Sequence, residues 1–171
     1  MKKKKQAKRT PRRQATPRVV IVGFGRVGGA IALGLREAGW DVAVLPRSAD
    51  SVRKAASLRV FLADHDDLRA AQLCVLAVPD SAVVPAMELV EEDLGPSTAL
   101  VHCSGALPLA TFATARTKRP VGSFHPLAAI SDPKDSLAGH TVALASTDRT
   151  LHGNLERMAT ALGMSPLEVP E

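Results

Sequence analysis

Apolar residues in this chain gather in short runs, separated by longer stretches in which apolar and polar residues mix. Val19–Val22 is a continuous, largely β-branched run, which predicts a short buried strand. The following residues place Ala30, Ile31 and Leu35 at helical spacing. Leu73–Val78 is a second continuous run of the kind found in sheets covered on both faces. This alternation predicts an α/β fold with a doubly wound, mostly parallel sheet.

Further elements are expected where short apolar runs follow turn residues. Helices are expected over 49–58, 64–71, 107–116 and 151–162, and another helix is capped by Asp80. Pro85 fits that last helix only within its first turn. The other expected strands are Asp41–Leu45, Arg59–Leu62, Thr98–His102, Val121–Phe124, His140–Ala145 and Leu167–Val169.

A glycine-rich turn, GFGRVG, joins the first strand to the first helix. Strand, G-x-G-x-x-G and helix is the layout that holds a dinucleotide pyrophosphate at a helix N-terminus. Gly23 would allow the tight turn, Gly25 would leave room for the phosphates, and Gly28 would let the helix pack closely on the strand. Such turns can also be purely structural, but the flanking strand and helix favour nucleotide binding. The cofactor residues predicted here are Gly23, Phe24, Gly25, Arg26, Val27 and Gly28.

The end of the second strand predicts which dinucleotide is bound. An acidic residue at this place would bind the ribose 2′-hydroxyl of NAD. The sequence has Arg47 and Ser48 instead, a cation and a hydroxyl suited to the 2′-phosphate of NADP. NADP is therefore expected over NAD, although Asp50 would return an acid to the site if the register shifted by two residues.

The end of the strand at Leu73–Val78 supplies a second part of the cofactor site. Open α/β sheets bind ligands at the carboxyl ends of their strands. Ala77, Val78 and Pro79 are small or apolar residues at that position, so the ribose and nicotinamide could lie across them.

Composition and charge narrow the classes of function. Aromatic residues make up 3% of the chain, which argues against a base-stacking surface for single-stranded nucleic acid. Residues 1–18 hold nine of the 22 Lys and Arg residues and no acid, so the net charge of +5 leaves −4 for Val19–Glu171. Residues 1–17 are expected to form a disordered basic tail, either solubilising or in weak contact with nucleic acid or an anionic surface.

The two cysteines, Cys74 and Cys103, lie far apart in apolar runs and form no C-x-x-C pair. They are expected to be reduced core thiols of a cytoplasmic protein rather than zinc ligands or a disulfide. No metal site and no membrane span are expected, since no apolar run approaches the length needed to cross a bilayer.

Five segments together resemble a known family: GFGRVG, LPRS, AVPDSAV, VHCSGAL and GSFHPLAAI. In this order they are similar to the Rossmann-like oxidoreductases that carry domain of unknown function 2520, relatives of pyrroline-5-carboxylate reductase and prephenate dehydrogenase. The resemblance spans about Val19–Glu171. It implies an NADP-binding Rossmann domain over residues 18–171 and hydride transfer to or from a small substrate.

The same resemblance implies two catalytic residues. Prephenate dehydrogenases carry a serine after the equivalent fifth strand and a histidine in a His-Pro motif after the sixth, which correspond to Ser104 and His125. The histidine would accept a hydroxyl proton as hydride leaves the carbon, and the serine would orient the same oxygen. A purely structural His125 that caps a loop through backbone hydrogen bonds is the alternative. His102, at a strand end, is expected to be a structural histidine, with contact to the nicotinamide as the alternative.

The chain departs from the family pattern at its end. Family members continue with a helical domain that forms the dimer and walls the substrate pocket, and this sequence stops at Glu171. A homodimer or a partner chain would then have to supply that wall. Three functions stay open: an NADP-dependent oxidoreductase, a non-catalytic NADP-binding sensor or docking module, and a protein that binds nucleic acid or a surface through its basic tail and uses the fold only as a scaffold.

Overall fold

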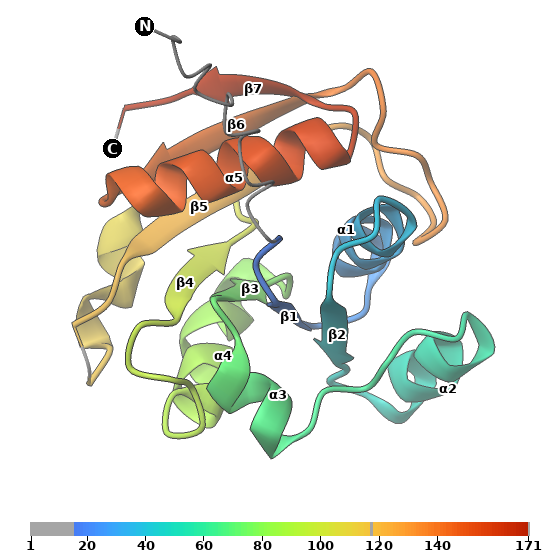
Figure 1. Ribbon diagram of the computed structural model, residues 1–171, viewed down its shortest axis with the longest axis horizontal. Coiled ribbons are helices and arrows are strands. Elements are labelled where there is room, and N and C mark those ends of the chain that lie inside the picture. The colour runs from blue at the N-terminus through green and yellow to red at the C-terminus, as the bar shows by residue number, and fades with distance from the viewer. Residues whose placement is uncertain (1–15, 117, 171) are drawn as a thin grey trace, which may run out of the picture.

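The computed structural model describes residues 16–116 and 118–170, so the predicted basic tail lies outside it except for Thr16 and Pro17. One seven-stranded sheet in the order β2-β1-β3-β4-β5-β6-β7 forms its centre (Figure 1). All neighbouring strands are parallel except β5 and β6, which confirms the predicted α/β class with a mostly parallel sheet. The strands are β1 (Val19–Val22), β2 (Val42–Leu45), β3 (Leu73–Leu76), β4 (Ala99–His102), β5 (Val121–Leu127), β6 (Thr141–Ser146) and β7 (Ser165–Glu168).

Helices cover both faces of the sheet, as the continuous apolar strands require. One core cluster joins the sheet to α1, α2 and α5, and a second joins it to α3, α4 and the 3₁₀ helix η2. Successive side chains of a strand point to opposite faces of the sheet, so each strand contributes to both clusters. In β1, Val19 and Ile21 belong to the first cluster, and Val20 and Val22 belong to the second. The helices are α1 (Arg26–Glu37), α2 (Ala49–Ser57), α3 (His65–Ala70), η1 (Asp80–Ala82), α4 (Val83–Val90), η2 (Leu109–Thr114) and α5 (Arg149–Ala161).

Three expected elements differ from the structure. Arg59–Leu62 is not a strand: Arg59 adopts a left-handed conformation with φ of 53°, and only Leu62 forms a bridge, to Val44. The helix expected over 107–116 is the shorter 3₁₀ helix η2. Strand β5 runs three residues past the expected end at Phe124, because its antiparallel pairing with β6 extends to Leu127. Pro85 does lie in the first turn of α4.

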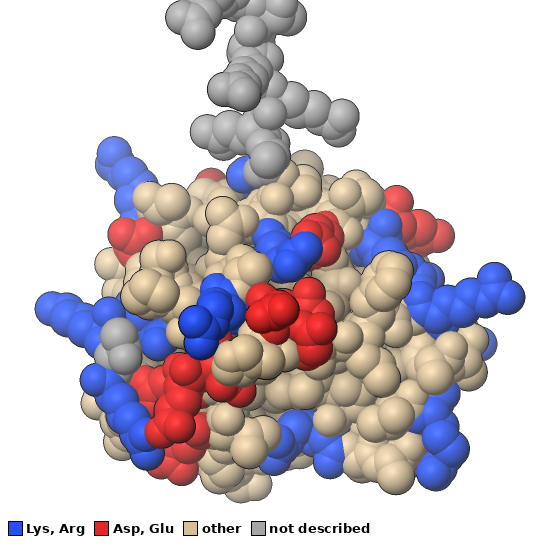
Figure 2. Space-filling model, turned by 60° about the horizontal axis from the view of Figure 1, so that its bottom comes forward, with Lys and Arg blue, Asp and Glu red and all other residues tan. Residues whose placement is uncertain are grey.

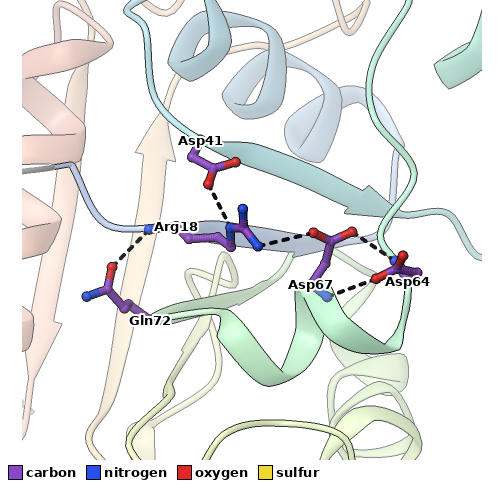
Figure 3. A network of polar contacts seen from close by, with 5 residues as sticks. All are labelled: Arg18, Asp41, Asp64, Asp67 and Gln72. Atoms are coloured by element: carbon purple, nitrogen blue, oxygen red, sulfur yellow. Dashed lines mark hydrogen bonds and ion pairs between the residues drawn. The ribbon is translucent and has the colours of Figure 1, made fainter.

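A polar network holds the start of β1 to the amino edge of the sheet (Figure 3). The Arg18 side chain donates from Nε to Asp41 at 2.6 Å and from Nη1 to Asp67 at 3.4 Å, while its backbone N–H donates to Gln72 at 3.0 Å. The hydrogen bond with Asp41 is the main reason that the pKa of Arg18 is raised. Asp67 in turn shares a capping box with Asp64 at the start of α3. The network therefore ties three segments that are distant in sequence.

The molecular face around α3 and α4 carries both signs of charge. Figure 2 shows groups of acidic side chains on this face, flanked by Lys and Arg. This face therefore differs from the broad basic surface typical of nucleic-acid binding. Within the described residues, no helix is long and apolar enough to span a membrane.

Candidate functional site

The strand order places the predicted motifs at one edge of the sheet. The chain passes from β1 outward to β2, and then crosses back to β3 on the other side of β1. Open α/β sheets bind ligands beyond the carboxyl ends of the strands at such a switch point. The turn at Gly23–Gly28 follows β1, and the segment Ala77–Pro79 follows β3 at that same edge.

Each glycine of the turn has a distinct environment. Gly23 has φ of 99°, and a Cβ there would lie 2.5 Å from the carbonyl oxygen of Ala77. A Cβ on Gly28 would lie 2.3 Å from the carbonyl oxygen of Gly23, so α1 packs directly on the turn. A Cβ on Gly25, in contrast, would meet no atom within 4 Å. Gly23 and Gly28 are thus required by the fold, whereas Gly25 faces open space.

That open space lies in front of the N-terminus of α1. Gly25 is the N-cap residue of this helix, and no side chain caps it. The first backbone N–H groups of a helix lack intrahelical acceptors and carry the positive end of the helix dipole. A phosphate at Gly25 would accept hydrogen bonds from them.

A cavity of about 360 Å³ lies in front of this helix end. Nine of the predicted cofactor residues line it: Gly23, Phe24, Gly25, Arg26, Arg47, Ser48, Ala77, Val78 and Pro79. Val27 and Gly28 do not line it; Gly28 packs under the turn, and Val27 packs against the core. The Phe24 side chain is buried, with 2% of its surface exposed.

The structure adds Asp50, Ser51 and Lys54 to the cavity wall. All three belong to α2, and the spacing of Ser48, Ser51 and Lys54 at every third residue would have been the sequence signal for a shared helical face. Ser48 is the N-cap of α2, and its hydroxyl accepts a hydrogen bond from the backbone N–H of Ser51 at 3.2 Å. Asp50 forms an exposed ion pair with Arg53 at 3.3 Å.

A second cavity, of about 470 Å³, brings together Ser104 and His125. The sequence predicted His125 just after the strand that ends at Phe124. In the structure His125 lies within β5, because pairing with Ala143 of β6 keeps this part of the chain extended. The rest of the wall is mainly apolar and includes Leu107 and Leu167.

The His125 ring has a defined orientation. Its Nδ1 lies 3.0 Å from the carbonyl oxygen of Cys103, which can only accept, so Nδ1 carries the proton in the neutral ring. Nε2 is left as the acceptor. It lies against Gly105, where a Cβ would come within 2.4 Å of it. The arrangement presents a half-buried imidazole that can take up a proton at Nε2.

Ser104 shapes the turn beside this ring. Its hydroxyl oxygen accepts hydrogen bonds from the backbone N–H groups of Ala106 at 3.0 Å and Leu107 at 3.1 Å. Ser104 therefore has a structural role in the turn, and its O–H group remains a potential donor toward the cavity.

His102 is the buried polar residue of β4, and none of its side chain is exposed. Neither ring nitrogen has a hydrogen-bond partner among the described residues. Its ring centroid lies 5.5 Å from that of Phe112. Burial lowers the pKa of His102. The Asp80 carboxylate and the backbone at Ser104 and Pro108 oppose the shift, and the positive form of His125 adds to it.

This lowered pKa predicts acid sensitivity of the fold. Below about pH 6.5, the unfolded chain binds a proton at His102 that the folded chain does not, so the free energy of unfolding falls as the pH falls toward the folded-state pKa. Denaturant titrations between pH 7.5 and about pH 5 should show a shallower loss of stability in His102→Leu than in the wild type. Parallel pH profiles would contradict the burial of a neutral His102.

The two cysteines are unsuited to nucleophilic chemistry. Both are free thiols, and burial raises the pKa of Cys74 and of Cys103 to about 12. They are therefore uncharged at neutral pH. No group of three or more His, Cys, Asp or Glu side chains in the described part of the chain is placed to hold a metal ion.

Comparisons with known proteins identify the fold. The family model described as Rossmann-like domain matches residues 2–128. A proposed NADP oxidoreductase from Bacteroides fragilis superimposes with a TM-score of 0.77 at 19% identity, over 90% of this chain and 61% of that one. Prephenate dehydrogenase from A. aeolicus, solved with hydroxyphenyl propionate and NAD⁺, gives 0.75 at 19% identity, over 92% and 61%. Pyrroline-5-carboxylate reductase from Streptococcus pyogenes gives 0.70 at 18% identity, over 91% and 59%.

These likenesses establish a shared fold at low sequence identity. They confirm the predicted resemblance to prephenate dehydrogenase and pyrroline-5-carboxylate reductase at the level of architecture. The chain spans about three-fifths of the length of these solved proteins. A search of curated proteins finds no match to this sequence.

Proposed function

The chain belongs to the Rossmann-like domain family, and on this premise we propose that it is the dinucleotide-binding domain of an NADP-dependent oxidoreductase. The observation that carries the proposal is the cavity at the end of α1, where Gly25, Arg47 and Lys54 meet. The residues around Gly25 would hold NADP, whose nicotinamide would accept or supply a hydride near His125, where a small-molecule substrate would lie.

Gly25 and the first turn of α1 would hold the pyrophosphate. The lack of a side-chain cap leaves the first N–H groups of α1 available, and the space over Gly25 lets phosphate oxygens approach them. Arg26 lines the same cavity and adds positive charge.

The other end of the cavity favours a 2′-phosphate. Arg47 and Lys54 both line it, and two cations match a phosphate dianion. Asp50 also lines this cavity, and its negative charge would repel a 2′-phosphate and would instead suit the 2′-hydroxyl of NAD. Its pairing with Arg53 offsets that charge, so the balance supports NADP.

Arg47→Ala and Lys54→Ala test this assignment. We expect each substitution to weaken NADPH binding by about tenfold, the loss of one charge-assisted contact, and to leave NADH binding nearly unchanged. Calorimetric titration with both nucleotides measures the effect. Lys134→Ala is the matched control, since Lys134 is an exposed cation outside the cavity lining. An equal loss for both nucleotides would show that these cations do not recognise the 2′-phosphate.

His125 would perform the proton transfer. The strands β1, β3, β4 and β5 are successive neighbours, so the ends of β1 and β5 are separated by three spacings, about 14 Å. A dinucleotide anchored at Gly25 would extend across Ala77–Pro79 toward His125. With Nδ1 held by the Cys103 carbonyl, Nε2 would accept the substrate's hydroxyl proton as hydride leaves the carbon that bears this hydroxyl for the nicotinamide.

We expect His125→Ala to lower turnover by at least about a hundredfold, the range that general-base residues contribute, without changing NADPH affinity. The measurement is an NADP⁺-reduction screen over small hydroxy compounds, with calorimetry on the same variant. Ser81→Ala, an exposed position outside both cavities, serves as the control.

A non-catalytic NADP-binding module is the second candidate. Catalysis requires that water be excluded from the reacting atoms, and His125 is half-exposed in the described part of the chain. An active enzyme would need a wall from further residues, a homodimer or a partner chain. Tight NADPH binding with no turnover in any screen would favour the module.

A further inference from the structure

We propose that a third cavity, between η2 and the start of β5, binds a small organic anion with an apolar body. Its volume is about 610 Å³, within the range of small-molecule sites. It shares no residue with the cavity at Gly25, and only Leu109 with the cavity at His125. The site thus stands independently of the proposed nucleotide binding.

Three cations line this cavity: Arg116, Lys118 and Arg119. The described residues that line it include no Asp or Glu. Arg116 is paired with Glu92 at the surface. No carboxylate of the described residues lies within ion-pair distance of Lys118 or Arg119. The electrostatic environment of the cavity therefore favours an anion.

Arg119 is the buried member of this set, with 8% of its surface exposed. Its Nη1 donates to the carbonyl oxygens of Gly95 at 3.2 Å and Thr98 at 3.1 Å, which fixes the side chain in the wall. Its Nε has no hydrogen-bond partner among the described residues. A buried guanidinium held by neutral carbonyls is costly, and an anion in the cavity that the Arg119 side chain lines would offset part of that cost through the attraction of opposite charges.

The remaining wall is apolar except for Thr147, whose hydroxyl is bonded to the Val121 backbone, and it sets the class of ligand. Leu109, Phe112 and Val121 line it, together with alanines of η2 and the residues after it. A small inorganic ion would contact only the cations and would leave the apolar part of the cavity wall exposed to water. A carboxylate on a chain of several methylene groups would bury it while its head group contacts the cations.

The third cavity, called the anion site from here on, is also separate in space from the proposed catalytic residue His125. Val121 and His125 lie four residues apart on one strand, so their side chains point to the same face at a separation of about 13 Å. A ligand in the anion site would contact Leu109 from one side, and a substrate near His125 would contact it from the other.

Octanoate is the probe that tests the site, with 1-octanol as its uncharged counterpart, each titrated into the full chain and followed by NMR or calorimetry. We expect octanoate to bind in the micromolar to millimolar range and more tightly than 1-octanol. Lys118→Gln should raise the octanoate Kd by about threefold, the effect of one exposed charge, and Lys134→Gln, an exposed lysine outside this cavity, should not. Ala113→Glu places a carboxylate on the exposed lining and should abolish binding.

Absence of octanoate binding, equal binding of octanoate and 1-octanol, or an unchanged Kd in both Lys118→Gln and Ala113→Glu would overturn the proposal. Circular dichroism of each variant shows whether it is folded. NADPH titration of the same samples separates the two sites, because loss of octanoate binding with intact NADPH binding concerns the anion site alone.

Discussion

Gly25→Val is expected to weaken NADPH binding by about a hundredfold, or about 2.7 kcal/mol, while the melting temperature stays close to that of the wild type. The reason lies in the space around this residue. A Cβ at Gly25 meets no protein atom within 4 Å, and its backbone φ of −84° is open to all residues. The valine side chain would therefore occupy only the volume that the phosphates need. Calorimetry with NADPH and a thermal melt measure the two effects.

The control for this variant is Gly153→Ala, which lies in α5 and also has open space at its Cβ position. It should bind NADPH as the wild type does. If Gly25→Val bound NADPH normally, the glycine turn would be a structural feature only, and the assignment of the cavity at Gly25 to the pyrophosphate would be wrong.

Gly28→Ala is expected to lower the free energy of unfolding by about 3 kcal/mol, the upper range for overpacking in a well-packed core. Its Cβ would lie 2.3 Å from the carbonyl oxygen of Gly23 and 3.0 Å from the Cβ of Ala77, and the nearer contact is with backbone that cannot rotate away. The helix α1 would have to move off the sheet. Urea denaturation followed by circular dichroism measures the loss.

Gly153→Ala again provides the comparison, because the same substitution in a helix without a steric contact should stabilise the protein by about 0.5–1 kcal/mol. A Gly28→Ala variant as stable as the wild type would mean that α1 does not pack on the turn as closely as described.

Sequence patterns sufficed for the elements whose structure depends on local residues. The strands at Val19–Val22 and Leu73–Leu76 are continuous apolar runs, and burial on both faces is what such runs require. The glycine turn was recognisable because only glycine tolerates the φ of 99° at Gly23. Nine predicted cofactor residues lie around one cavity for a related reason: parallel strands bring their carboxyl ends to one edge.

Long-range pairing decided the parts that the sequence did not predict. Strand β5 continues through His125 and Pro126 because β6, which begins fourteen residues after Leu127, supplies antiparallel hydrogen bonds. The spacing of Ser48, Ser51 and Lys54 marks a shared face of α2, but only the tertiary structure brings that face to the cavity at the glycine turn. Arg59–Leu62 reads as a strand by composition, yet it lies at the edge of the sheet and pairs at one position.

The sequence by itself determined the fold class, the switch-point edge and the glycine turn, since hydrophobic period and backbone sterics act over a few residues. Only the tertiary structure placed Arg116, Lys118 and Arg119 around one cavity and buried the His102 ring with no hydrogen-bond partner among the described residues. Both features depend on which segments pack together, and packing sets burial, charge compensation and cavity shape across distances that local patterns do not encode.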